Sequence, residues 1–228
     1  TDRRVQLGRR AIDPPGQARQ DLDILIDMAR RLGLDWRYDG PRAVFDEMRQ
    51  AMPSIAGITW ERLEKDGAVT YPCRRPDDPG EAVLFAERFP RPGGRARLVA
   101  ADFVNADELP DSAYPLVLIT GRQLEHWHTG AMTRRASVLD TIEPVPVASL
   151  HEDQLTAAGV LPGDAIRLWS RRGSVIARAR VDNGLQVGQV FLPFCYHEAA
   201  ANLLTNDALD PDGKIPEFKF CAVAVEPA

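Results

Sequence analysis

The hydrophobic pattern before residue 70 predicts helices. Apolar residues recur at intervals of three and four at Leu22, Leu25, Ile26, Ala29 and Leu32. Gly33 follows, where a helix C-terminus favours glycine. A second helix is predicted to start at Pro41, with Asp39 as its cap. A third helix, over Thr59–Lys65, uses Thr59 as its N-cap.

Prolines and glycines interrupt the chain from Tyr71 to Gly94. They stand at Pro72, Pro76, Pro79, Gly80, Pro90, Pro92, Gly93 and Gly94. Two short apolar runs, Ala82–Ala86 and Leu98–Ala101, are predicted to pair as a small hairpin. The remainder is predicted to be an irregular connection.

From residue 112 onward the pattern is that of short strands. They are predicted at Tyr114–Thr120, Val145–Leu150, Ala165–Ser170, Ser174–Val181 and Val190–Phe194. In the fourth, Val175, Ala177, Ala179 and Val181 are expected to face inward. One small helix is predicted over His151–Ala158. Short strands at this spacing favour a closed β-barrel.

The helices and hairpin before residue 112 do not make a core of their own. We therefore expect them to be the end of a domain that starts upstream of Thr1, which is not a methionine. The helix around Leu22, Leu25 and Ile26 is then expected to expose apolar surface.

Composition excludes several classes of protein. The 228 residues are 44% hydrophobic and 27% charged, which excludes a wholly disordered chain. No apolar run reaches the ~18 residues that a membrane span needs. A net charge of −5 gives nucleic-acid binding no support. Eight Lys and Arg residues nevertheless lie between Arg122 and Arg180, which favours a small anionic ligand there.

The segment Thr120–Gly130 carries the candidate chemistry. It follows a strand, and Gly121 lets the backbone approach a ligand closely. Arg122 and Thr129 can bind phosphate or a planar polar ring, and Trp127 offers a stacking face. The alternative is that Gly-Arg here is an ordinary turn.

Two further motifs have a plainer interpretation. His126 and His128 are spaced as a metal pair, but no third ligand lies close in sequence. The three cysteines, Cys73, Cys195 and Cys221, form neither a disulfide framework nor a CxxC site. Cys195 precedes His197, but a small buried thiol is favoured over a nucleophile.

Three long segments resemble one known family. TGRQLEHWHTGAMTRR (120–135), the stretch 151–181 and the stretch 191–223 resemble the C-terminal domain of bis-molybdopterin guanine dinucleotide oxidoreductases of molybdenum or tungsten. Asp212-Gly213 departs from the family pattern. The resemblance implies an α+β chain: a six-stranded double-psi β-barrel preceded by a helical remnant of an upstream α/β domain. The expected divisions are 1–70, an irregular connection 71–111, and the dinucleotide-binding barrel 112–228.

The first half narrows this resemblance. Thr1–Trp36 and Met52–Cys73 resemble the catalytic α subunit of cytoplasmic, NAD-dependent formate dehydrogenases. That implies oxidation of formate to CO2 at a molybdenum or tungsten centre. 4Fe–4S clusters, FMN and NAD would lie elsewhere in the complex. The implied partners are the rest of the subunit upstream of Thr1 and iron–sulfur and flavin/NAD-binding subunits, with no membrane. A nitrate reductase of the same superfamily and a non-catalytic barrel module are the alternatives.

The family's cofactor contacts carry over to thirteen positions. They are Thr120, Gly121, Arg122, Gln123, Leu124, Glu125, His126, Trp127, His128, Thr129, Phe194, Asn202 and Lys219. No residue is implied as catalytic or as a metal ligand, so this chain alone is expected to be inactive.

Overall fold

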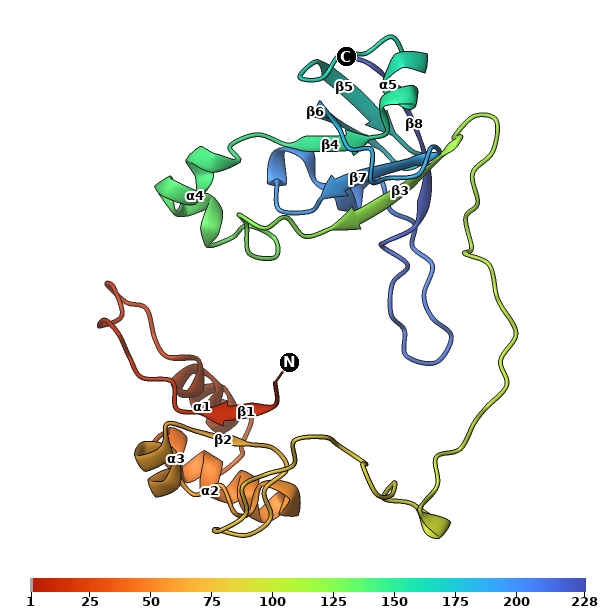
Figure 1. The fold of residues 1–228 in the computed structure, drawn as a ribbon. Helices are drawn as coiled ribbons and strands as arrows, with labels where there is room; N and C mark the ends of the chain where they lie inside the picture. Colours follow the sequence, from red (N-terminus) through yellow and green to blue (C-terminus); the bar gives the residue numbers. More distant parts are fainter. Residues whose placement is uncertain (1) are drawn as a thin grey trace. The chain divides into compact units, whose positions relative to one another are not determined.

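A computed structural model of the protein describes residues 2–228. The chain folds into two compact units, one ending at Val99 and one starting at Ala100 (Figure 1). The domain boundaries expected after residues 70 and 111 remain predictions. In the described part of the chain no helix is both long and apolar enough to cross a bilayer.

The first unit contains three helices and a small sheet. They are α1 (Asp21–Arg31), α2 (Pro41–Ala51), α3 (Trp60–Asp66), β1 (Arg4–Gln6) and β2 (Ala68–Thr70), with 3-10 turns at Pro53–Ile55 and Pro92–Gly94. All three predicted helices are confirmed. The Thr59 hydroxyl accepts a hydrogen bond from the Arg62 amide at 3.1 Å, which confirms the predicted cap. The cap predicted at Asp39 is wrong, because Gly40 precedes α2 without a side-chain bond.

A few buried side chains hold the first unit together. They are Ile55, Ile58, Leu63, Val69 and Cys73. The strand pair β1–β2, antiparallel, was not predicted, since each strand has only three residues. Of the three α1 residues expected to expose apolar surface, Leu25 is 54% exposed and Leu22 is half-buried, whereas Ile26 is 7% exposed and belongs to the core.

The predicted hairpin in the connection is wrong. Neither 82–86 nor 98–101 forms a strand, and Leu98 and Val99 are exposed. Prolines at 90 and 92 remove backbone donors between the two runs, and an isolated hairpin of this length is marginal in water. The apolar character of the two runs was therefore not sufficient to pair them.

The second unit is a closed six-stranded barrel. Its strands are β3 (Leu116–Gly121), β4 (Val147–Leu150), β5 (Ala165–Trp169), β6 (Ser174–Val181), β7 (Gln189–Pro193) and β8 (Cys221–Pro227). The order around the barrel is β3-β7-β4-β6-β5-β8. β3 and β7 are parallel, as are β4 and β6, and the other pairs are antiparallel. The predicted α+β class with a mixed six-stranded barrel is confirmed.

Short helices complete this unit. They are α4 (Ser137–Ile142), α5 (Glu152–Ala157) and the 3-10 turns Thr133–Arg135, His197–Ala199 and Ala201–Leu203. Helix α5 was predicted. Helix α4 was not, because its six residues are too few to show a helical period.

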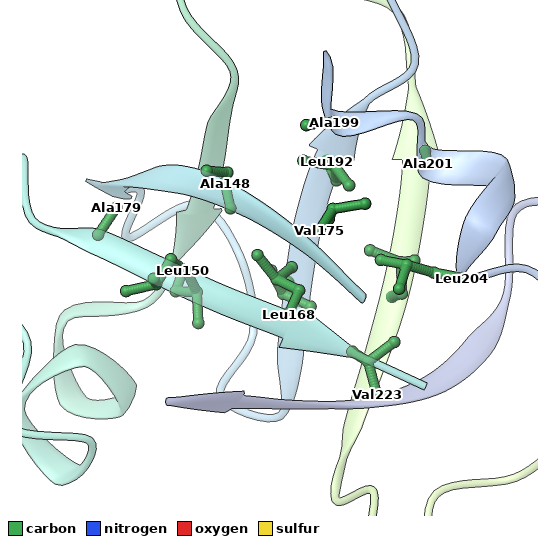
Figure 2. Close-up of a cluster of buried hydrophobic side chains, with 14 of the residues drawn as sticks. Ala148, Leu150, Leu168, Val175, Ala179, Leu192, Ala199, Ala201, Leu204 and Val223 are labelled. Carbon is green, nitrogen blue, oxygen red and sulfur yellow. The ribbon is translucent and has the colours of Figure 1, made fainter. Parts of the chain in front are cut away.

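Alternation along the strands fills the barrel. On β6, Val175, Ala177 and Ala179 are buried while Ile176 is exposed, as the period of two predicts. Val181 was expected inside but lies outside, at the end of the strand. Figure 2 shows Val175 and Ala179 gathered with leucines of other strands, such as Leu150, Leu168 and Leu192.

The parallel pair β3–β7 positions the candidate site. Gly121 and Pro193 lie opposite each other at the ends of these strands. Because parallel strands end at the same edge, the two loops that leave them start side by side. We call 122–135 the first loop and 194–206 the second loop.

Candidate functional site

The end of β3 is fixed by close contacts. A Cβ at Gly121 would lie 2.5 Å from Cε2 of Phe191, so a larger residue here would require the Phe191 ring to move. The Phe194 amide donates to the Gly121 carbonyl at 3.1 Å. The buried Thr120 hydroxyl donates to the Phe218 carbonyl at 2.6 Å. These contacts set where both loops begin.

A cavity of about 700 Å³ lies where the two loops meet. Four of the predicted site residues line it: His128, Thr129, Phe194 and Asn202. Its other polar and aromatic lining was not predicted from the sequence; it includes Tyr196, Asn206, Asp207 and Phe218. The His128 and Phe194 rings meet edge to face, with their centroids 5.3 Å apart. The cavity therefore combines aromatic faces with amide and carboxylate groups.

A second cavity, of about 620 Å³, is lined by the first loop itself. Its wall is residues 122–128 with Thr133 and Leu139. His128, whose φ of 51° is left-handed, borders both cavities. Trp127 is 68% exposed, so its indole face is open to a ligand or to another part of a protein. Leu124 is exposed as well.

Gln123 holds an unused donor. Its Oε1 lies 3.4 Å from the Tyr196 hydroxyl, whose one proton goes to the Glu143 carbonyl, and its buried Nε2 has no hydrogen-bond partner among residues 2–228. A buried polar atom without a partner is costly, and such atoms concentrate where a ligand or water completes the bonding. Gln123 Nε2 is thus a candidate donor to a bound group.

His126 has a different environment from the rest of the segment. Its side chain is buried, with Nε2 2.8 Å from the Glu143 carbonyl and Nδ1 3.3 Å from the Thr133 hydroxyl. Both ring nitrogens are therefore occupied within the chain. The same Thr133 hydroxyl accepts from the Trp127 amide at 2.9 Å, so His126 and Thr133 together order the first loop.

The metal-pair interpretation of His126 and His128 loses its support, because His126 has no free nitrogen. Over residues 2–228 no group of three His, Cys, Asp or Glu side chains is arranged to hold a metal ion.

Arg134 and Tyr196 connect the two loops, and neither was predicted from the sequence as a site residue. The Arg134 guanidinium lies 4.6 Å from the Tyr196 ring centroid and 2.8 Å from carboxylate oxygens of Asp140 and Glu198. The Tyr196 hydroxyl donates its proton to the Glu143 carbonyl at 3.0 Å. Burial raises the pKa of Tyr196 to about 12, so its hydroxyl stays protonated as a donor. The only signal in the sequence was that the two residues lie in the segments 120–135 and 191–223, which resemble the known family.

Cys195 lies under the second loop as a buried thiol. Burial raises its pKa to about 11, and its side chain is almost inaccessible. A nucleophile needs a thiolate. The structure therefore favours the buried-thiol interpretation over a Cys–His nucleophile.

The basic stretch from Arg122 to Arg180 does not form an open anion-binding site, contrary to the expectation from its charge. Five of its eight cations pair with carboxylates: Arg134, Arg167, Arg171, Arg172 and Arg180. Sequence position alone could not show these pairings, because several partners lie far away in the chain. Arg122 is exposed and lines the second cavity.

Two predicted residues remain. Glu125 is half-buried in the wall of the second cavity. Lys219 is exposed and lines neither cavity, with its Nζ 5.7 Å from the ring centroid of Phe218. The structure therefore brings together twelve of the thirteen predicted residues at one end of the barrel, and Lys219 lies one residue from the lining.

Comparison with known protein families supplies a match for the barrel. Residues 116–222 match the family described as Molydopterin dinucleotide binding domain. The barrel has the double-psi fold of that domain. The family's region spans all of β3 to β7 and both loops.

Relatives extend the match to the first half. The chain is 39% identical to the α subunit of the F420-dependent formate dehydrogenase of Methanocaldococcus jannaschii, over 99% of this chain and 34% of that protein. It is 31% identical to the periplasmic nitrate reductase of Desulfovibrio desulfuricans, over all of this chain and 33% of that one. The chain thus spans about a third of the length of the curated relatives it matches.

A solved structure shows the same fold. Acetylene hydratase from Pelobacter acetylenicus matches 99% of this chain with a TM-score of 0.72 and 17% identity, over 35% of its own length. At this identity the likeness concerns the fold alone.

The loop residues fit a dinucleotide-bearing pterin in their chemistry. Such a group is planar, polar and anionic, and it needs donors, stacking faces and close backbone. The unbonded Gln123 Nε2, the exposed Trp127 indole and the His128–Phe194 rings are groups of this kind.

Proposed function

We propose that this chain is the C-terminal, cofactor-holding part of the catalytic α subunit of a formate dehydrogenase. In that enzyme formate is oxidised to CO2 at a bis-molybdopterin guanine dinucleotide centre, which supplies the two-electron chemistry. The observation that carries the proposal is 39% identity to a formate dehydrogenase α subunit over nearly the whole chain. The proposal divides the chain into the end of an upstream domain (1–70), a connection (71–111) and the dinucleotide-binding barrel (112–228).

The thirteen predicted residues have different roles in this proposal. His128, Thr129, Phe194 and Asn202 contact one dinucleotide in the larger cavity, and Gln123 donates through its free Nε2. The remaining exposed residues of 120–129 contribute backbone and side-chain contacts. His126 acts by ordering the loop, because its ring is already bonded. Lys219 supplies a point charge from the rim.

The electron acceptor is a separate part of the proposal. The sequence resemblance favours NAD, reached through 4Fe–4S clusters and FMN in partner subunits of a cytoplasmic complex. Three relatives at 37–39% identity are named as F420-dependent. The proposal takes NAD as acceptor, with F420 as the competing outcome.

Enzyme assays on the intact complex test both points. The complex containing this chain is purified and supplied with formate and an artificial viologen acceptor, then with NAD or F420. Formate-dependent reduction of viologen and of NAD is the expected result. Reduction of viologen and of F420, but not of NAD, would identify F420 as the acceptor. A fully loaded enzyme that does not oxidise formate would overturn the proposal.

A nitrate reductase is the second candidate, favoured by 31% identity over the whole chain to the Desulfovibrio desulfuricans enzyme. The same preparation, given reduced viologen and nitrate, distinguishes the two. Nitrite formation without formate oxidation would establish this alternative.

A further inference from the structure

A short exposed turn in the first unit concentrates positive charge. Residues 87–97, which we call the basic turn, contain four arginines and one glutamate. Arg88, Arg91, Arg95 and Arg97 are all exposed, and none forms a salt bridge or side-chain hydrogen bond within the described chain, residues 2–228. The whole chain carries a net charge of −5, so this turn runs against the overall balance.

Other arginines of the same unit behave differently. Nine of them pair with carboxylates of the unit, for example Arg42 with Glu61 and Arg62 with Asp66. Neutralisation by neighbours is therefore common in this unit, whereas the basic turn places four arginines without a salt bridge within eleven residues. Four like charges in eleven residues repel one another, so an anionic surface would stabilise them.

The basic turn has a preformed backbone. Gly93 and Gly94 have φ of 80° and 68°, which glycine adopts at little cost. The Phe89 amide donates to the Gly94 carbonyl at 2.9 Å, and the Gly94 amide donates to the Arg91 carbonyl at 2.9 Å. A turn closed in this way presents its arginines with less ordering entropy to lose on binding.

Aromatic side chains beside the turn favour a protein as the partner. The Phe85 and Phe89 rings stack with centroids 5.1 Å apart and are 48% and 37% exposed. Arginine and aromatic residues dominate the energetics of protein interfaces. A nucleic acid or anionic bilayer presents an extended negative surface, which the net charge of −5 repels outside this turn.

We propose that the basic turn docks an acidic patch on a separate polypeptide, with its arginines facing carboxylates and Phe85 and Phe89 at the rim. This rests on the proposed function only in that the partner is another subunit of the enzyme complex. The arginines steer the encounter and fix its orientation, so the association weakens as salt is added.

Zero-length cross-linking tests the contact directly. The intact complex is prepared with Arg91→Lys or Arg95→Lys and treated with a carbodiimide, which joins an amine to a carboxylate it touches. Arg9→Lys is the matched control, because Arg9 is also exposed and without a salt bridge among the described residues. The expected result is a cross-link from residue 91 or 95 to an Asp or Glu of a second polypeptide, absent with Arg9→Lys. Cross-links confined to this chain's own polypeptide, or no more than the control gives, would overturn the proposal.

Neutralising the turn provides the quantitative test. The variant Arg88→Gln/Arg91→Gln/Arg95→Gln/Arg97→Gln is expected to weaken subunit association at least tenfold at low salt and to flatten its salt dependence. Formate-to-viologen turnover is expected to stay unchanged, so a loss of association is separable from a failure of the proposed function. Unchanged association, or loss of binding to phosphatidylserine vesicles or duplex DNA in its place, would contradict a protein partner.

Discussion

Gly130 lies where the first loop packs closely against the second loop. Its φ of 74° is left-handed, and a Cβ there would lie 2.5 Å from the Cys195 carbonyl oxygen and 2.6 Å from Cγ of Arg134. The Gly130 carbonyl also accepts a hydrogen bond from the Arg134 amide at 2.9 Å. Glycine is required here for conformation and for space at once.

Gly130→Ala is expected to destabilise the barrel by about 3 kcal/mol, since strain and overlap add. Gly159→Ala is the matched control: its φ of 68° is similar, but nothing lies within 4 Å of the added Cβ. The control should cost about 1 kcal/mol. Urea unfolding followed by circular dichroism measures both, and equal losses would show that the backbone contact with Cys195 is unimportant.

Cys195 gives a prediction about reactivity. With a pKa of about 11, its thiolate fraction at pH 8 is about one in a thousand, and the fraction grows only as pH rises towards 11. We expect Cys195, which is also buried, to resist iodoacetamide in the folded chain at pH 8 and to react in denaturant. Mass spectrometry of the alkylated chain checks this, and rapid native labelling at Cys195 would revive its role as a nucleophile.

The residue types in the sequence identified the candidate segment, but they did not show which side chains in it are bonded within the chain. Thr120–Thr129 was found because a glycine and polar side chains follow a strand. That His126 is bonded on both nitrogens could not be predicted, because its partner Glu143 lies in a stretch with no regular pattern. Arg134 was likewise read as part of a basic stretch, although Glu198, 64 residues away, neutralises it.

Among the elements, α3 offers a test of a sequence-predicted cap. The Thr59 hydroxyl accepts from the Arg62 amide, so Thr59→Ala should cost about 1 kcal/mol and Thr59→Ser much less. Thermal unfolding of the first unit measures the difference. Equal stability of the three chains would mean that α3 is held by Leu63 in the core and not by its cap.

The segment that leads into β3 is tied to the β5–β6 turn by charge. Glu108 pairs with Arg171 and, at 2.6 Å, with Arg172, whose Nε donates to the Leu204 carbonyl at 3.0 Å. Burial alone would raise the pKa of Glu108, but hydrogen bonds from Arg172 and Arg171 outweigh it and lower the pKa below its ordinary value. The ionised form is therefore the one that the fold stabilises.

Glu108→Gln should consequently destabilise the barrel at pH 7 by about 1 kcal/mol. A carboxyl with a lowered folded pKa stabilises the fold above its ordinary value of 4.5, and that contribution is lost as pH falls through the lowered pKa. Denaturant titrations at a series of pH values from 7 downward should show a difference from the parent chain that shrinks as pH falls below 4.5. A difference that stays unchanged over this series would contradict the ion pair.

Elements with a clear period were predictable and short ones were not. The period of 3.6 residues identified α1, and alternation identified β5 and β6. β1, β2 and α4 have three to six residues, over which no period can be distinguished. The wrong hairpin at 82–101 shows the converse, because strand-like composition does not pair without a sheet to join.

At the scale of the whole molecule, the barrel is complete and the site it carries is open. Loops from two parallel strands surround the larger cavity, and the exposed Trp127 and Leu124 border the smaller one. The chain matches about a third of its relatives' length. In the proposed function, these two cavities hold one dinucleotide of the cofactor.

The central claim is that the larger cavity holds a guanine dinucleotide of the pterin cofactor. The most direct measurement is the GMP released by acid from the purified intact enzyme, per mole of subunit, for the parent and for Phe194→Ala/Asn202→Ala. Gln186→Ala, an exposed position in the β6–β7 turn, is the control. The double variant should release at most half the GMP of the parent while its circular dichroism spectrum stays unchanged, and the control should match the parent. Full GMP content in the folded double variant would contradict the claim.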